Sequence, residues 1–145
     1  MGNVLQMSGN VTYFVRKLQK GMYIIKKRME ISASHQLSLS YESKCCRLHG
    51  HNWIIEVYCK ANELNADGMV VDFSHIKEVV QGKLDHQNLN DVLPFNPTAE
   101  NIAWWICQQI PSCFKVSVQE SEGNIAIYIK DDETMDAYES KRNIL

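Results

Sequence analysis

Hydrophobic and polar residues alternate along four stretches of the 145-residue chain, and this period of two predicts β-strands. The first two stretches are residues 22–35 and 49–60. The last two, residues 114–120 and 124–130, are joined by a short loop that contains Gly123, a combination typical of a β-hairpin. We therefore expect two pairs of neighbouring strands, one near each end of the domain.

Two stretches between these pairs repeat their hydrophobic residues at helical spacing instead. One predicted helix begins near Asp72 or Ser74, and the other follows Asn96 or Thr98, either of which can cap it. Residues 84–96, which connect the two, are expected to form a loop. The order β-β-α-α-β-β predicts an α+β fold, with a four-stranded antiparallel sheet and two helices on one face.

Length and composition agree with one globular domain. Residues 22–130 are expected to form it, with an N-terminal extension of uncertain origin at 1–21 and a charged C-terminal tail at 131–145. The formal net charge of -2 and the lack of a long apolar run argue against nucleic acid and membranes as partners. The five cysteines are irregularly spaced, which argues against a disulfide framework and favours a reducing, cytoplasmic compartment.

Three histidines continue the core-facing sides of the first two predicted strands. His49 and His51 are two residues apart, so both imidazoles project from the side that Trp53 continues. His35 has the matching parity on the first strand, which can pair with the second as a long hairpin. Three converging imidazoles are the ligand set of a catalytic zinc with an open fourth position. The alternative is that each is an ordinary core or surface histidine, which is the usual case for a single histidine but less so for this set.

Two adjacent cysteines, Cys45 and Cys46, precede the histidine pair. A structural zinc site prefers four closed ligands, often with cysteines at C-x-x-C spacing, and adjacent cysteines do not easily chelate one ion. A thiol four residues before His49 would lie near a bound cation, which favours the thiolate and a role as base or nucleophile. On position alone, two ordinary loop residues are an equally good interpretation.

Other candidate groups are acidic or basic side chains at the ends of elements. Glu120 ends the apolar face of the third long strand, where a carboxylate suits a ligand with two parallel N–H groups, unless it turns into solvent. Asp85 and His86 form a second acid/base pair, which is a weak signal alone. Arg47, Lys26 and Lys44 are candidates for phosphate contacts, with solvated surface charge as the alternative.

Several motifs occur in a fixed order along the chain. They are ISASH, CCRLHGH, GMVVDFSHIK, LDHQNLND, NPTAENIA and a strand that ends in Glu120. The ordered set covers about residues 22–129 and resembles the 6-pyruvoyl-tetrahydropterin synthase / 6-carboxytetrahydropterin synthase family. The spacing from cysteine to the first histidine is similar to that of the bacterial 6-carboxytetrahydropterin synthases of queuosine biosynthesis.

The resemblance implies a tunnelling fold in which three subunits close a barrel and two barrels stack into a homohexamer, with active sites at subunit interfaces. It implies a lyase that converts 7,8-dihydroneopterin triphosphate to 6-carboxytetrahydropterin, acetaldehyde and triphosphate. By the same resemblance, zinc is held by His35, His49 and His51, with a general base at Cys45 or, by a shift of register, Cys46. Asp85 and His86 would form a proton relay from a neighbouring subunit, and Glu120 and Thr98 would bind the pterin.

Three alternatives remain open at this point. The same site can give the 6-pyruvoyl product, the chain can be a non-catalytic zinc- or pterin-binding relative, or a nucleophilic cysteine can serve a Cys-His-Asp hydrolase.

Overall fold

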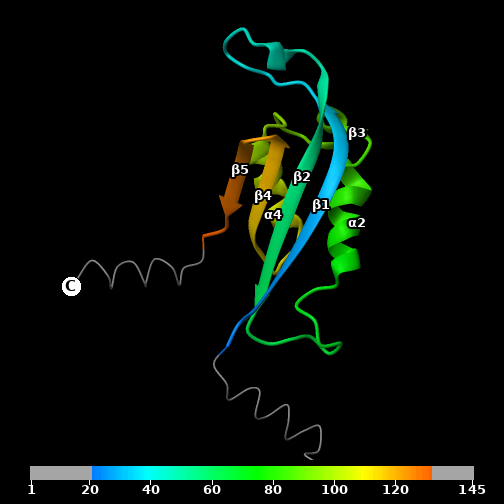
Figure 1. Ribbon diagram of the computed structural model, residues 1–145, viewed down its shortest axis with the longest axis vertical. Helices are drawn as coiled ribbons and strands as arrows, with labels where there is room; N and C mark the ends of the chain where they lie inside the picture. The colour runs from blue at the N-terminus through cyan, green and yellow to red at the C-terminus, as the bar shows by residue number, and fades with distance from the viewer. Residues whose placement is uncertain (1–20, 132–145) are drawn as a thin grey trace, which may run out of the picture.

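A computed structural model describes residues 21–131 of the protein, and nearly all of the predicted extension and of the predicted tail lies outside this range. In the described residues, five strands form one sheet with helices packed on one face (Figure 1). No helix among these residues is both long enough and apolar enough to cross a membrane.

The sheet is mixed and has the strand order β3-β1-β2-β4-β5. The long strands β1 (Tyr23–His35) and β2 (His49–Ala61) pair antiparallel along their whole lengths. β4 (Cys113–Ser121) pairs antiparallel with β2, and β5 (Asn124–Ile129) pairs antiparallel with β4. The fifth strand, β3 (Gln87–Asn88), is only two residues long and runs parallel to β1.

Two helices of eleven or twelve residues cover the sheet, as the helical spacing predicted. α2 (Phe73–Leu84) is capped by Asp72, whose carboxylate accepts a hydrogen bond from the backbone N–H of Ser74 at 2.7 Å. α4 (Ala99–Gln109) is capped by Thr98, which decides between the two predicted caps. A turn of 3-10 helix, η1 (Lys44–Cys46), interrupts the loop between β1 and β2.

The prediction of a four-stranded, fully antiparallel sheet with two helices was too simple. The segment 84–96, predicted as a loop, contains β3 and a single helical turn, α3 (Leu89–Val92). These elements depend on pairing with β1, since the backbone N–H of His86 donates to the carbonyl of Ser32 at 2.7 Å. Such short elements have no period of their own to detect in the sequence. The α+β class is nevertheless confirmed.

The alternation of the long strands separates a buried face from an outer face. Val57, Ile55 and Trp53 of β2 are buried, together with Ile31 and Met29 of β1. These side chains pack with the apolar sides of α2 and α4 to form the core. The same parity continues into His35 and His51, so the core leads directly into the histidines at one end of the sheet.

Candidate metal and catalytic site

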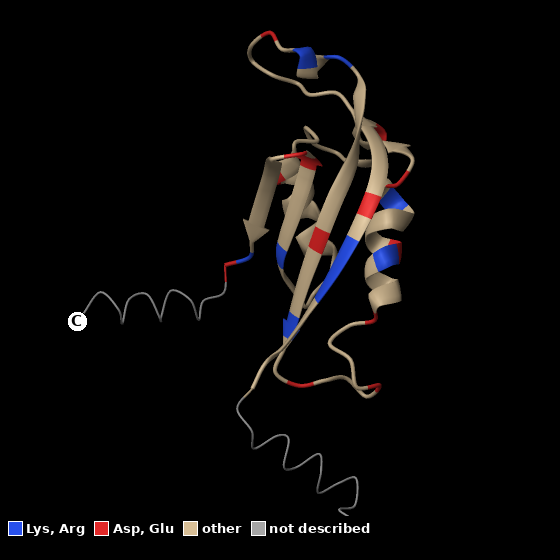
Figure 2. Ribbon diagram, in the orientation of Figure 1, with Lys and Arg blue, Asp and Glu red and all other residues tan. Residues whose placement is uncertain are grey.

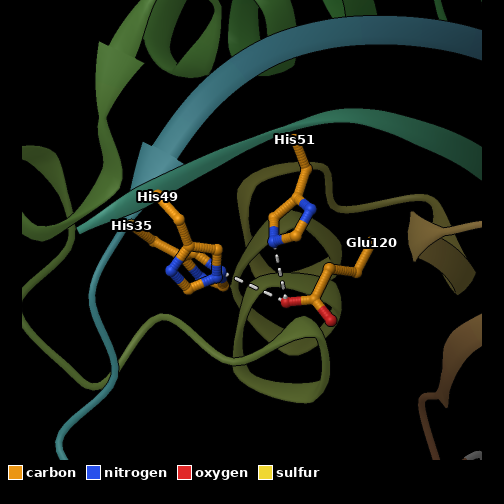
Figure 3. Close-up of side chains that lie close together, drawn as sticks. All are labelled: His35, His49, His51 and Glu120. Carbon is orange, nitrogen blue, oxygen red and sulfur yellow. Dashed lines mark hydrogen bonds and ion pairs between the residues drawn. The ribbon is translucent and has the colours of Figure 1, made fainter. Parts of the chain in front are cut away.

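The site begins where β1 ends and β2 begins. His35 and His49 are direct cross-strand partners, and the next pair on the same face of the ladder is Ala33 with His51. The three imidazoles therefore meet at one end of the β1–β2 pair, and Figure 3 shows them pointing toward one another and toward Glu120. One nitrogen of each histidine and one carboxylate oxygen of Glu120 all lie within 4.8 Å of each other.

Backbone carbonyls orient two of the three rings. Nδ1 of His35 lies 2.8 Å from the carbonyl oxygen of Pro97, and Nδ1 of His49 lies 2.6 Å from that of Arg47. A carbonyl only accepts, so each Nδ1 carries the proton and donates. The opposite nitrogen, Nε2, then has a free lone pair in the neutral ring. This is the arrangement in which backbone carbonyls support histidines that bind a metal.

These free lone pairs face one another. Nε2 of His35 lies 3.0 Å from Nε2 of His49 and 3.2 Å from Oε1 of Glu120. Nε2 of His51 is buried and has no hydrogen-bond partner in the described part of the chain; Oε1 of Glu120 is 3.5 Å away from it. Acceptors packed this closely repel unless a proton or a cation lies between them.

The residues present fit a bound metal ion such as zinc. Zinc–imidazole bonds of about 2.0–2.1 Å place two ligand nitrogens of a tetrahedral site roughly 3.3 Å apart, close to the spacing of these atoms. A cation would also satisfy Nε2 of His51. Nitrogen and carboxylate ligands suit zinc among several divalent ions, so the donor set by itself fits a metal without fixing its identity.

The surroundings favour the neutral form of His35 and His51 and hold their rings in place. His35 is fully buried, and the indole ring of Trp53 packs against it and His51 at ring-centroid distances of 4.9 and 5.2 Å. The indole N–H donates to the carbonyl of Ala33 at 3.1 Å, which fixes the ring. Burial is the main cause that lowers the pKa of both His35 and His51, and repulsion from the neighbouring imidazoles adds to it. Glu120 opposes this decrease in both pKa values.

Glu120 comes to the cluster from β4. Its side chain is about a quarter exposed, and the pairing of β4 with β5 is irregular between Gln119 and Ser121. The sequence predicted a carboxylate at the end of the core-facing side of this strand. It did not indicate that the carboxylate contacts two of the imidazoles.

Cys45 is not one of the groups gathered around the histidines. It belongs to η1, in the loop that projects beyond the ends of β1 and β2 (Figure 1). Its backbone is fixed on both sides, since its N–H donates to Oγ of Ser43 at 3.1 Å and its carbonyl accepts from Leu37 at 2.8 Å. Cys46, the other candidate base, has its thiol 3.9 Å from the carbonyl of Tyr41.

Asp85 and His86 lie at the edge of the sheet. Oδ1 of Asp85 accepts a hydrogen bond from the backbone N–H of Ser32 at 2.9 Å, and Oδ2 is 3.7 Å from Nε2 of His86. The His86 side chain is 83% exposed, and its backbone has a positive φ of 56°. His86 borders an open hollow of about 570 Å³ together with outward-facing residues such as Ser34 and Asn52. Within this chain neither Asp85 nor His86 belongs to the group of side chains that gathers around the histidines.

Two of the remaining predicted residues, Thr98 and Lys26, have partners within this chain. The Thr98 hydroxyl oxygen accepts from the backbone N–H of Asn101 at 3.2 Å and so caps α4. Lys26 forms an ion pair with Glu56 at 3.3 Å on the outer face, toward the end of β1 that is opposite to His35. Figure 2 shows Lys and Arg residues in the projecting loop, which contains the other two cationic candidates, Lys44 and Arg47.

Sequence reasoning missed the groups that act through the backbone. The carbonyls of Pro97 and Arg47 orient histidines, and a carbonyl has no residue-type signature. Pro97 is part of the NPTAENIA motif, so the motif marked the segment without revealing its contact.

Comparisons with known proteins identify relatives of this chain. The sequence model described as 6-pyruvoyl tetrahydropterin synthase matches residues 24–131. A 6-carboxy-5,6,7,8-tetrahydropterin synthase of a Synechocystis species is 39% identical over 121 residues, covering 74% of this chain and 93% of the relative. The 6-pyruvoyl tetrahydrobiopterin synthase of Dictyostelium discoideum is 33% identical over 127 residues, covering 72% of this chain and 94% of that protein.

The fold is similar to that of solved structures as well. The 6-pyruvoyl tetrahydropterin synthase of Caenorhabditis elegans superposes with a TM-score of 0.64 at 24% sequence identity, over 79% of this chain and 99% of that one. Because the family model spans most of the chain, and a relative at 39% identity spans 74% of it, the chain belongs to the 6-pyruvoyl tetrahydropterin synthase family.

Proposed function

We propose that this protein is a zinc-dependent 6-carboxytetrahydropterin synthase. It would convert 7,8-dihydroneopterin triphosphate and water to 6-carboxy-5,6,7,8-tetrahydropterin, acetaldehyde and triphosphate, in the biosynthesis of queuosine and related 7-deazapurines. The observation that carries the proposal is the convergence of the Nε2 atoms of His35, His49 and His51, in a chain 39% identical to a 6-carboxytetrahydropterin synthase.

The three histidines would hold the zinc, which when bound would polarise the side-chain hydroxyls of the substrate as a Lewis acid. The carbonyls of Pro97 and Arg47 keep Nε2 of His35 and His49 free for this task. Burial in turn lowers the pKa of His35 and His51, so both rings remain neutral ligands at neutral pH.

The pterin ring would be bound by Glu120 and Thr98. A 2-amino-4-oxopyrimidine presents two parallel N–H groups, which match the two oxygens of the Glu120 carboxylate. The Thr98 oxygen already accepts from Asn101, so its own proton remains available to donate to the ring.

Cys45 would accept the proton from the substrate side chain. The loop that contains it joins the two strand ends where His35 and His49 lie, which supports a position near the reacting carbon. Asp85 and His86 would serve as the proton relay for the site of a neighbouring copy, a role supported by the exposed side chain of His86 at the sheet edge. The proposed assembly is a homohexamer of two stacked trimeric barrels in the tunnelling-fold arrangement.

The decisive experiment identifies the products. The zinc-loaded protein is incubated with 7,8-dihydroneopterin triphosphate, acetaldehyde is trapped as a hydrazone, and the pterins are separated by liquid chromatography with mass spectrometry. We expect acetaldehyde and 6-carboxytetrahydropterin in equal amounts. A 6-pyruvoyl product without acetaldehyde would instead support the activity named for the Dictyostelium relative.

Paired cysteine variants separate an enzyme from a binding protein. Cys45→Ala should lower kcat by about 100-fold or more, because the general base is lost, and should retain the bound zinc. Cys46→Ala is the matched control and should remain active. Equal activity of wild type and Cys45→Ala would remove Cys45 from the mechanism, and an inactive wild type with bound zinc would indicate a non-catalytic relative.

A further inference from the structure

Two asparagines, Asn90 and Asn96, bind the backbone of the chain directly after His35. Each does so with a pair of hydrogen bonds to one residue, which we call a grip. Asn90 Oδ1 accepts from the backbone N–H of Gln36 at 2.8 Å, and its Nδ2 donates to the carbonyl of the same residue at 2.8 Å. Asn96 does the same at Ser38, with distances of 2.9 and 3.0 Å. Each side-chain amide therefore forms the pair of hydrogen bonds that the backbone of a neighbouring strand would form.

The residue between the two grips faces the other way. In an extended segment, successive backbone groups point to opposite edges. Gln36 and Ser38 are bound by the asparagines, whereas the N–H of Leu37 donates to the carbonyl of Cys45 at 2.8 Å. Residues 36–38 thus act as a short ribbon, with the two asparagines on one edge and Cys45 on the other.

The asparagines themselves stand on the segment that supports the histidines. Asn96 is followed by Pro97, whose carbonyl accepts from His35, and by Thr98, which caps α4. The Asn96 carbonyl accepts from the side chain of Asn101 at 2.9 Å, which ties it to the first turn of α4. Asn90 is fixed in turn because its backbone N–H donates to Oδ1 of Asn88 at 3.1 Å.

One frame, residues 88–98, therefore holds both His35 and the backbone of Cys45. The projecting loop is otherwise largely exposed, and its residues 41, 42, 44, 47 and 48 are all open to solvent. The asparagine grips and the Leu37–Cys45 hydrogen bond connect η1 with this frame. The motifs LDHQNLND and NPTAENIA contain these asparagines, and neither the ligand set nor the acid/base pair accounts for them.

We propose that Asn90 and Asn96 are positioning residues that hold Cys45 at a fixed distance from the histidine cluster. The catalytic part of this inference rests on the proposed role of Cys45 as the base. The structural part, that the two asparagines fix the backbone of Cys45, does not depend on that role. Loss of either grip loosens residues 36–38, releases the carbonyl of Cys45, and lets the thiol leave its place, while the histidines keep their own supports.

The test compares Asn90→Ala and Asn96→Ala with Asn62→Ala, an exposed asparagine in the loop after β2 that serves as the matched control. Three quantities are measured on zinc-loaded protein: the metal content, the hydrogen-exchange rates of the 36–38 amides, and the rate of Cys45 alkylation by iodoacetamide. Tandem mass spectrometry assigns the alkylated cysteine. Asn96→Asp keeps the size and the acceptor but loses the donor. It replaces Asn96→Ala in the test if that variant fails to fold.

We expect faster exchange at Leu37, although its own partner Cys45 is unchanged, and a several-fold change in the alkylation rate of Cys45. The zinc content should stay the same. With substrate, kcat should fall by about 10- to 100-fold, with little change in KM, because a displacement near 1 Å of a reacting group has that effect.

The outcomes separate this inference from the proposed function. Unchanged exchange at Leu37 and unchanged alkylation of Cys45 would overturn the grip, whether or not the wild type turns over dihydroneopterin triphosphate. Altered exchange and alkylation with an unchanged kcat would overturn the positioning role. If the wild type is inactive but the variants still change hydrogen exchange at Leu37 and alkylation of Cys45, the grip is supported. The proposed function is then contradicted.

Discussion

Two of the three histidines in the cluster use one ring nitrogen for support and leave the other free to bind. Nδ1 of His35 and of His49 is bound to a backbone carbonyl, while Nε2 faces the centre. His51 differs because its buried Nε2 has no hydrogen-bond partner in the part of the chain that the structure describes. Buried polar atoms without a partner are rare in folded proteins, so this atom is the strongest single indication of a ligand at the centre.

Glu120 is close enough to the imidazoles to act either as a metal ligand or, as proposed, as the group that binds the pterin. Glu120→Gln keeps the size but loses the charge. If Glu120 binds the pterin, the variant retains about one zinc per chain and KM rises by about 10- to 100-fold, the effect of losing a hydrogen bond to a charged group. Zinc content by atomic absorption and steady-state kinetics measure the two effects.

His51→Ala is the control for that experiment, because it removes an imidazole ligand and should lose the metal. A Glu120→Gln protein that loses zinc as His51→Ala does would make the carboxylate a fourth ligand and would contradict its assignment to the pterin.

The lowered pKa values of His35 and His51 predict how the stability of the metal-free protein depends on pH. Both folded-state pKa values lie below the ordinary value of 6.5, mainly because of burial. Between the folded-state pKa and 6.5, the unfolded chain therefore binds more protons than the folded chain. The contribution of the two neutral histidines to the free energy of unfolding is therefore fully present above pH 6.5. It is lost as the pH falls from 6.5 through the folded-state pKa values. Urea denaturation of the metal-free protein at pH 7.5 and at lower pH values measures this.

His51→Gln removes one of the two titrating groups and should reduce the slope of stability against pH below 6.5. If the slope of this variant equals that of the wild type, burial of the His51 ring does not cause the acid sensitivity.

At the scale of elements, the sequence predicted what has a period and missed what does not. Alternation located β1, β2, β4 and β5, and helical spacing located α2 and α4. β3 and α3 are too short for any period, and they form because Ser32 offers backbone partners to Asp85 and His86. Strand alternation also predicted that His35, His49 and His51 lie on the same side as the core residues. The approach of Glu120 was not, since it depends on the pairing of β4 with β2.

Thr98 begins the element that supports His35, and its capping contribution can be measured. Thr98→Ala removes the oxygen that accepts from Asn101, and we expect the free energy of unfolding to fall by about 1 kcal/mol. Thr98→Ser keeps the hydroxyl and should lie close to the wild type. Urea denaturation gives both values, and equal stability of the alanine variant and wild type would mean that the Thr98 cap contributes little to the fold.

At the scale of the whole molecule, the sheet has two edges that invite another copy of the chain. β5 forms one edge, and its outer-face residues Ile125, Ile127 and Ile129 are each more than half exposed. On the other edge, β3 pairs with β1 only at Ala33 and Ser34, and no other described strand covers β1. Open edges and exposed isoleucines favour pairing between copies, in line with the proposed barrel assembly.

A charge on the edge strand should disrupt this pairing. We expect Ile127→Lys to sediment as a smaller species than the wild type in analytical ultracentrifugation, because a buried lysine opposes strand addition. The zinc content should remain, since all three histidines belong to one chain. Met69→Lys, which changes an exposed hydrophobic residue in the loop before α2, is the control and should leave the assembly intact.

Mixing two inactive variants tests whether copies also share an active site. Cys45→Ala lacks the proposed base and His86→Ala lacks the exposed relay, so each should be inactive alone. If Cys45 of one copy works with His86 of its neighbour, reassembly of an equal mixture restores both groups at roughly a quarter of the interfaces, by random pairing. Turnover of the mixture, measured before and after partial denaturation and refolding, reports this recovery.

A mixture that stays inactive after proven exchange of chains would place the relay and the base in the same subunit. The exposed edge position of His86 would then need another explanation.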